Sequence, residues 1–162
     1  MQGKDPAPRA LIGLLRERFA LDWCGIHGAP HWARVRRNGL VLAERTGASR
    51  RVVSLFAFLH DSCRLDDCRD AKHGQRAAAL VDSLRSAGLL SLSDEEAELL
   101  CLACRDHSDG RTDADITVQT CWDADRLDLG RVGRRPDPRF LCTPAARDRE
   151  LIAWAYRRSI AA

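Results

Sequence analysis

The sequence predicts an all-α protein, a single-domain bundle of about six or seven helices over residues 1–162. Two patterns and one number predict this fold. Apolar residues recur at three- and four-residue spacing along most of the chain, and no segment alternates polar and apolar residues as a strand does. Hydrophobic residues make up 45% of the chain, so one core can form without disulfide bonds.

The first three expected helices lie in the N-terminal part of the chain. Leucines at three- and four-residue spacing predict the first helix, over about residues 7–21. The second, over residues 31–46, is followed by Gly47, a residue type that often ends helices in a left-handed conformation. Ser49 is a suitable N-cap for the third helix, which we expect to reach about residue 63.

Two further helices follow a polar, aspartate-rich loop over residues 62–74. The apolar spacing resumes over about residues 73–87 and predicts a fourth helix. Ser93 and Glu96 are three residues apart and form a capping box, which predicts a fifth helix over about residues 93–106.

The C-terminal third is expected to hold the last two helices. Apolar spacing predicts one helix over about residues 118–129, and two prolines indicate a loop over 130–142. Thr143 as N-cap and Pro144 in the first turn predict the start of a final helix.

The composition excludes several classes of protein. The chain has 26 basic and 23 acidic residues, and this near balance gives no reason to expect a nucleic-acid partner. No apolar run reaches the roughly 18 residues of a membrane span, and the first six residues lack the apolar core of a signal peptide. We therefore expect a cytoplasmic protein without membrane contact, in which exposed apolar faces on the terminal helices would allow a homodimer.

The seven cysteines indicate reduced thiols, because an odd number in a cytoplasmic chain does not suit a disulfide framework. Cys101 and Cys104 form the one C-x-x-C pattern. Their segment is predicted to be helical, whereas a zinc knuckle needs a turn and a second pair of ligands. We therefore interpret these two residues as small buried side chains.

The most informative polar residues are histidines at expected helix ends. His60 is followed directly by Asp61, and both come after the apolar run over residues 55–59. An unpaired carboxylate in such a place costs several kcal/mol, so it must be paired or bind a metal ion. Imidazole nitrogen and carboxylate oxygen both bind divalent metals, and a carboxylate can reach two ions through its two oxygens.

The order of these residues resembles the HD domain superfamily of metal-dependent phosphohydrolases. His31 opens a helix, the pair His60 and Asp61 follows an apolar helix, and Asp125 lies in an Ala-Asp-x-Leu stretch. The resemblance covers about residues 27–130, and it implies that this range is the core of an HD-type helical domain with flanking terminal helices.

The resemblance also implies a set of metal ligands. A first divalent ion would be held by two histidines and two aspartates, His31, His60, Asp61 and Asp125. Asp61 would also reach a second ion, held together with His73 and His107. With a single ion, His73 and His107 would instead contact the substrate phosphate or a nearby carboxylate. Mixed nitrogen and oxygen ligands suit Mn, Fe, Co, Ni or Zn, and the sequence does not select among them.

The implied activity is hydrolysis of a small phosphorylated substrate, for example a nucleotide, by attack of a metal-bound hydroxide. Asp61 and Arg64 would carry the catalysis, with Arg64 at the position where many members have a lysine near the phosphate. Arg34, Arg64 and Arg126 would bind the substrate. The alternative is a metal-binding regulatory or interaction domain without catalysis, and the complete ligand set favours the enzyme.

Overall fold

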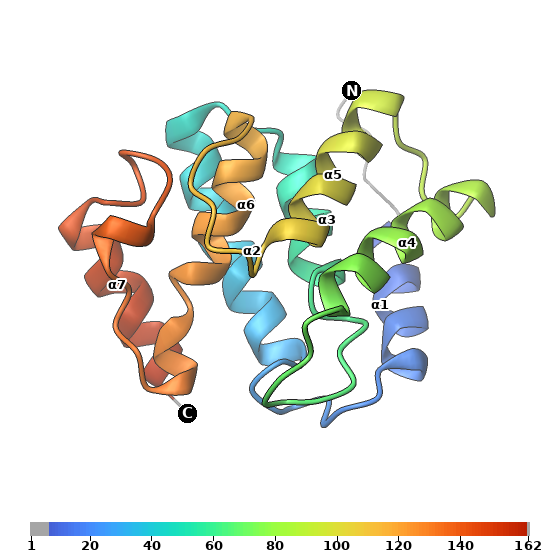
Figure 1. Ribbon diagram of the computed structural model, residues 1–162, viewed down its shortest axis with the longest axis horizontal. Coiled ribbons are helices and arrows are strands. Elements are labelled where there is room, and N and C mark those ends of the chain that lie inside the picture. Colours follow the sequence, from blue (N-terminus) through green and yellow to red (C-terminus); the bar gives the residue numbers. More distant parts are fainter. Residues whose placement is uncertain (1–6, 162) are drawn as a thin grey trace.

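The computed structural model describes residues 7–161, and the regular secondary structure in this range is all helical, with no strand (Figure 1). The all-α prediction is therefore confirmed. The α-helices are α1 (Ala7–Arg18), α2 (Ala29–Thr46), α3 (Arg50–Leu59), α4 (His73–Ser86), α5 (Asp94–Asp106), α6 (Ile116–Arg126) and α7 (Arg149–Ile160). Two short 3-10 helices, η1 (Leu129–Val132) and η2 (Pro138–Phe140), lie in the segment expected to be a loop. The first six residues, which lack the apolar core of a signal peptide, lie outside the described range.

The caps expected from the sequence are present at three helices. Gly47 ends α2 with φ of 76°, and the Ser49 side chain accepts a hydrogen bond from Val52 N at the start of α3. Ser93 and Glu96 form the reciprocal capping box of α5. These signals are local, so they can be recognised without the tertiary structure.

Several helix boundaries differ from those expected, among them the end of α6, which lies at Arg126 and not near residue 129. Helix α1 ends at Arg18 and not near residue 21, and α3 ends at Leu59 and not near residue 63. The earlier end of α3 places His60 and Asp61 in the turn that follows it, where Ser62 Oγ donates to the Leu59 carbonyl oxygen at 2.8 Å. These two candidate metal ligands therefore lie just beyond the end of α3.

The predicted start of the last helix at Thr143 is wrong. Helix α7 begins at Arg149, and Asp148 is its N-cap. Thr143 instead donates through N and Oγ1 to Asp123 Oδ2, at 2.8 and 2.7 Å. Since this buried carboxylate of α6 holds the segment before α7, residues 144–147 form turns and the helix starts later.

The core lies where α2 crosses both α3 and α6. At this crossing a Cβ built on Gly39 would lie 2.4 Å from Val53 Cγ1 of α3 and 3.3 Å from Ala124 Cβ of α6. The largest fully buried side chains include Trp32, Phe56, Leu100 and Trp122. Helix α5 packs against α3 and α6, and α4 packs against α5. One buried cluster runs from Leu11 to Ala155. No helix in the described range is long and apolar enough to cross a membrane.

Gly39 gives a test of this packing. We expect Gly39→Ala to lower the free energy of unfolding by about 1–3 kcal/mol, because the added methyl group overpacks the crossing of three helices. Gly13 in α1 is the matched control, since a Cβ there would meet no atom within 4 Å. Gly13→Ala should leave stability unchanged or raise it by up to about 1 kcal/mol through helix propensity. Urea denaturation measures both, and equal effects of the two substitutions would contradict this packing.

Candidate metal centre

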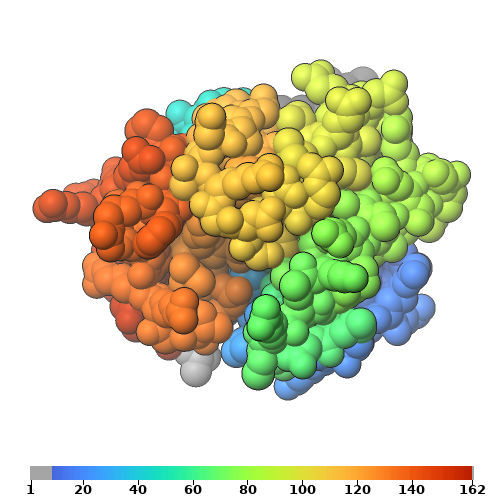
Figure 2. Space-filling view, viewed as in Figure 1, coloured from blue at the N-terminus to red at the C-terminus, as the bar shows by residue number. Residues whose placement is uncertain are grey.

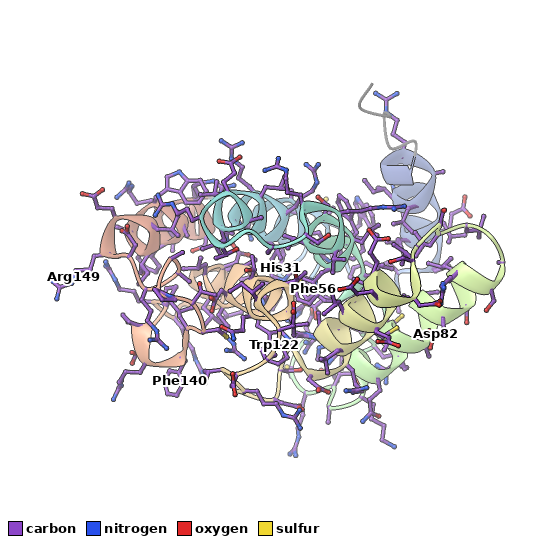
Figure 3. The ribbon with its side chains drawn as sticks, turned by 90° about the horizontal axis from the view of Figure 1, so that it is seen from above. His31, Phe56, Asp82, Trp122, Phe140 and Arg149 are labelled. Carbon is purple, nitrogen blue, oxygen red and sulfur yellow. The ribbon has the colours of Figure 1, made fainter. Side chains whose placement is uncertain are left out.

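The ends of five helices converge on one buried cluster of histidine and aspartate side chains. His31 lies in the first turn of α2 and His73 begins α4, whereas the other members lie at the ends of α3, α5 and α6. The complete cluster is His31, His60, Asp61, His73, His107 and Asp125. Figure 3 shows the labelled His31 in the middle of the molecule, close in that view to Phe56 and Trp122. All six side chains that the sequence predicted as ligands are thus brought together.

The first group of donor atoms surrounds His31 Nε2. This atom lies 3.0 Å from His60 Nε2, 3.5 Å from Asp61 Oδ2 and 3.4 Å from Asp125 Oδ1. His60 Nε2 lies 3.7 Å from each of the same two oxygens. We call these four residues, His31, His60, Asp61 and Asp125, the first group.

The second group contains Asp61, His73 and His107. The two Nε2 atoms of its histidines lie 2.9 Å apart. Asp61 Oδ1 lies 3.3 Å from the Nε2 of His73 and 3.5 Å from that of His107. Asp61 therefore directs Oδ2 to the first group and Oδ1 to the second.

The imidazole rings are oriented by hydrogen bonds at their other nitrogen. The Nδ1 atoms of His60 and His107 donate to the carbonyl oxygens of Phe56 and Cys104, at 3.1 and 2.7 Å. Likewise, His73 Nδ1 donates to a carbonyl oxygen, that of Asp70. Protons on Nδ1 leave the Nε2 lone pairs directed at the centre, the usual arrangement of metal-binding histidines.

Phe56 and Gly74 fix two of these histidines through packing. The Phe56 ring stacks on that of His60 with the centroids 4.8 Å apart. A Cβ on Gly74 would lie only 2.6 Å from the Cys104 carbonyl oxygen. Without a side chain at residue 74, α4 can approach the end of α5, and His73 thereby reaches His107.

The arrangement fits a bound metal ion. Ligand atoms about 2.1 Å from a common ion lie about 3.0–3.4 Å from one another, close to the separations within both groups. Two buried carboxylate oxygens, Asp61 Oδ1 and Asp125 Oδ1, have no hydrogen-bond partner among the described residues. Such oxygens are costly to bury unless a cation binds them. These residues can therefore hold a metal ion, and Asp125, with 15% of its side chain exposed, lies nearest to solvent.

The electrostatic environment keeps the carboxylates charged. Burial alone would raise the pKa of Asp61, but the neighbouring His60 and the contacts with His107, His31 and His73 hold that pKa well below its usual value. The pKa of Asp125 is lowered in the same way, mainly by His31, despite burial. The carboxylates of Asp61 and Asp125 are thus both anionic at neutral pH, as metal ligands must be.

The pKa values of the two histidines in the first group are shifted in opposite directions. Burial lowers the pKa of His60 to about 3, although Asp61 and Asp125 oppose this effect. Burial and the charge of Arg131 also disfavour the charged form of His31, but its contacts with Asp125, Asp128 and Asp61 outweigh them and raise its pKa to about 9. The carboxylates around His31 therefore stabilise a positive charge on its imidazole.

Asp128 and Arg131 belong to the site but were not predicted. Asp128 Oδ2 accepts a hydrogen bond from His31 Nδ1 at 2.7 Å. Arg131 Nη2 lies 3.8 Å from Asp125 Oδ1, and its Nε donates to the Ile26 carbonyl oxygen. In the sequence, the only signal for these two residues is that they lie shortly after Asp125. The turn after α6 decides which of these side chains face inward.

The three arginines predicted to bind substrate have different surroundings. Arg64 Nη1 lies 3.6 Å from Asp61 Oδ1, so Arg64 is at the centre. Arg34 instead donates to Asp128 at 2.7 Å and thereby supports His31 indirectly. Arg126 Nη1 donates to the Phe140 carbonyl oxygen at 2.9 Å, and this bond directs its guanidinium towards the segment after α6.

His27 and Cys104 lie outside the two groups. His27 is buried and its Nδ1 is 2.8 Å from Asp67 Oδ1, so it pairs with a loop carboxylate. Burial lowers its pKa, although the bond to Asp67 opposes this effect. Cys104 is buried inside α5, as expected for a small apolar side chain, whereas Cys101, expected to be buried as well, is only partly buried. All seven cysteines are free thiols.

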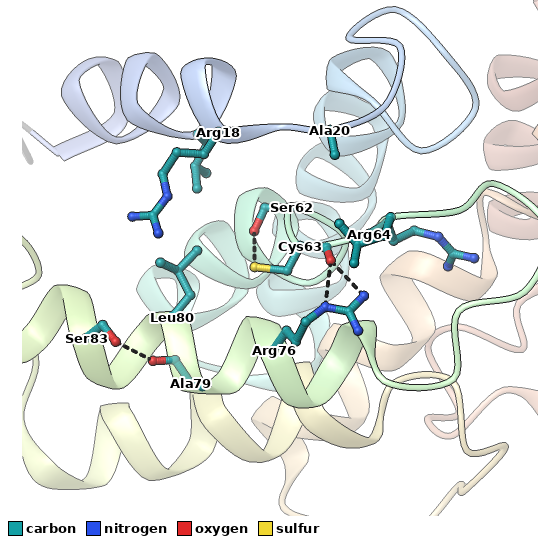
Figure 4. A pocket seen from close by; sticks show the side chains of 11 residues that line it. Arg18, Ala20, Ser62, Cys63, Arg64, Arg76, Ala79, Leu80 and Ser83 are labelled. Atoms are coloured by element: carbon teal, nitrogen blue, oxygen red, sulfur yellow. Dashed lines mark hydrogen bonds between the residues drawn. The ribbon is translucent and has the colours of Figure 1, made fainter.

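A cleft of about 320 Å³ adjoins the turn after Asp61 (Figure 4). Its walls include Arg18, Cys63, Leu80 and Arg76, the last of which donates to the Cys63 carbonyl oxygen. None of the six ligand candidates lines it. Arg64, which does line it, is shared between this cleft and the metal centre.

Comparison of the chain with protein-family models, with curated proteins and with solved structures found no match.

Asp128 gives a test of how the first group is oriented. We expect Asp128→Asn to weaken binding of a first Mn²⁺ ion by roughly 10- to 100-fold, since the carboxylate no longer supports the His31 imidazole. Calorimetric titration of the metal-free protein measures this change. Asp137→Asn is the matched control, because Asp137 contacts Arg139 on the surface. Equal affinities of the two variants would contradict a supporting role for Asp128.

Proposed function

We propose that this protein is a metal-dependent phosphohydrolase that acts on a small phosphorylated molecule. The observation that carries the proposal is the division of Asp61, which directs one oxygen to each of two groups of histidines. A carboxylate shared in this way is the arrangement expected of a centre for two divalent ions. The order of the ligand residues along the chain, which resembles the HD domain superfamily, supports the same proposal.

The first group would hold one ion through His31, His60, Asp61 and Asp125, and the second group would hold another through Asp61, His73 and His107. A divalent ion at such a centre supplies Lewis-acid chemistry, which activates water as a nucleophile at neutral pH and polarises a phosphoryl oxygen. Nitrogen and oxygen donors together suit Mn, Fe, Co, Ni or Zn.

The side chains next to the centre would bind and orient the phosphate. Arg64 adjoins the second group and Arg131 adjoins the first, so a phosphate at the centre meets a guanidinium on either side. Their N–H groups can donate to phosphoryl oxygens and offset the negative charge that develops during hydrolysis. Asp125 marks the accessible side of the site.

The surface around the centre is formed by three connecting segments. Figure 2 shows the loop after α3 in green, the loop after α5 in yellow and the segment after α6 in orange on the same face of the molecule. Loops of this kind commonly carry the residues that select a substrate, whereas the scaffold holds the reactive groups. The identity of the phosphorylated molecule therefore depends on these three segments.

Metal content is the first test of the proposal. We expect between one and two transition-metal ions per chain in the purified protein by elemental analysis, because the two groups together have ligands for two ions. His60→Ala should lose metal, because it removes a donor from the first group. Absence of metal in the wild type, even after reconstitution, would contradict the proposed function.

Hydrolysis of generic phosphoesters in the presence of Mn²⁺ is the second test. We expect Asp61→Ala to reduce the rate at least about a thousandfold, since it removes a ligand of both groups and leaves the histidines without their shared carboxylate. Asp137→Ala is the surface control. If the wild type binds metal but is as inert as Asp61→Ala, the alternative of a metal-binding regulatory domain takes precedence.

A further inference from the structure

We propose that the guanidinium of Arg64 competes with a metal ion for the second group, and that a phosphate group relieves this competition by accepting the guanidinium. The inference rests on the proposed function, because it concerns metal ions at the same centre. It goes further in making the second ion dependent on the substrate, whereas the first ion is resident.

Arg64 already contacts two of the three donors of the second group. Its Nη1 lies 3.6 Å from Asp61 Oδ1 and donates to His73 Nε2 at 3.4 Å. That hydrogen bond uses the lone pair with which His73 would bind an ion. A guanidinium has no lone pair and stays protonated, so it cannot act as a ligand and repels an incoming cation.

The first group has no arginine in such a position among the described residues. Arg131 Nη2 lies 3.8 Å from Asp125 Oδ1, but hydrogen bonds from Arg131 to the carbonyl oxygens of Ile26 and Asp128 hold its guanidinium. The first group also has two carboxylates, whereas the second has only one oxygen of Asp61. Both differences make the first group the stronger metal site.

The aspartates in the loop of Arg64 that a displaced guanidinium could reach already have partners. The three aspartates there are already engaged, Asp66 by the backbone N–H groups of Cys68 and Arg69, Asp67 by His27 and Asp70 by Arg76. The Arg64 side chain itself is only 11% exposed. A phosphate at the centre is therefore the acceptor of matching charge, and a guanidinium can donate to two of its oxygens at once.

The test is calorimetric titration of Mn²⁺ into the metal-free, full-length protein. For the wild type we expect two binding steps, the second at least about tenfold weaker because Arg64 opposes it. Arg64→Gln should strengthen the second step about tenfold or more and change the first by less than about threefold. Arg69→Gln is the matched control, because Arg69 is exposed in the same loop, and it should behave as the wild type.

A second variant separates charge from packing. Arg64→Lys keeps the positive charge, so its second step should stay weak, as in the wild type. A strengthened second step in Arg64→Lys would assign the effect to lost packing and overturn the proposal. An unchanged or weakened second step in Arg64→Gln would also overturn it, provided that circular dichroism shows a folded variant.

Inorganic phosphate is the probe for the second half of the proposal. It should strengthen the second Mn²⁺ step in the wild type and have a clearly smaller effect in Arg64→Gln, in which no guanidinium needs an acceptor. An equal effect in both proteins would overturn this half. One Mn²⁺ ion in both proteins would overturn the inference alone, whereas no Mn²⁺ binding in either would overturn the proposed function.

Discussion

The structure depends on where the Asp61 carboxylate lies. It is almost completely buried, and its oxygens contact the Nε2 atoms of four imidazoles that come from four different helices or their ends. Burying an anion is costly unless positive charge compensates it. Because the imidazoles use their Nδ1 protons elsewhere, the positive charge that completes this centre must come from protons, from Arg64 or from metal ions.

That requirement explains why so many helix ends meet at one point. Helix α3 stops at Leu59, so that Asp61 lies in a turn and is free to face two sides. Gly74 allows α4 to approach α5 closely, and Gly39 does the same for α2 against α3 and α6. Backbone carbonyls in the last turns of α3 and α5 accept the Nδ1 protons of His60 and His107. The Asp70 carbonyl, in the loop before α4, accepts that of His73. The helical packing and the polar centre are therefore two aspects of one arrangement.

The arginines around the centre differ in how firmly they are held. Arg34 and Arg131 are fixed by Asp128 and by backbone carbonyls, so they support the first group. Arg64 has one hydrogen bond to the backbone, from Nε to the Asp66 carbonyl oxygen, and its other contacts are with the second group. Because Arg64 is held less firmly than Arg34 and Arg131, the proposed response to a bound anion concerns the second group. The first group would bind its ion in the same way with or without the anion.

Local residue patterns predict the helices of this protein. Helical spacing and the caps at Ser49 and Ser93 depend on residues a few positions apart, so they can be recognised locally. The resemblance to the HD domain superfamily, carried by His31, the pair His60–Asp61 and Asp125, added the ligand order. That order can be read along the chain without knowing how far apart the residues lie in the folded protein.

How those residues act together depends on contacts between distant parts of the chain. The bond between His31 and Asp128 joins residues 97 positions apart, and the capture of Thr143 by Asp123, which delays the start of α7, spans 20 positions. The division of Asp61 between two groups and the approach of Arg64 to one of them also depend on helices that meet in space. Contacts of this kind are set by packing of the whole bundle, for which the local sequence contains no signal.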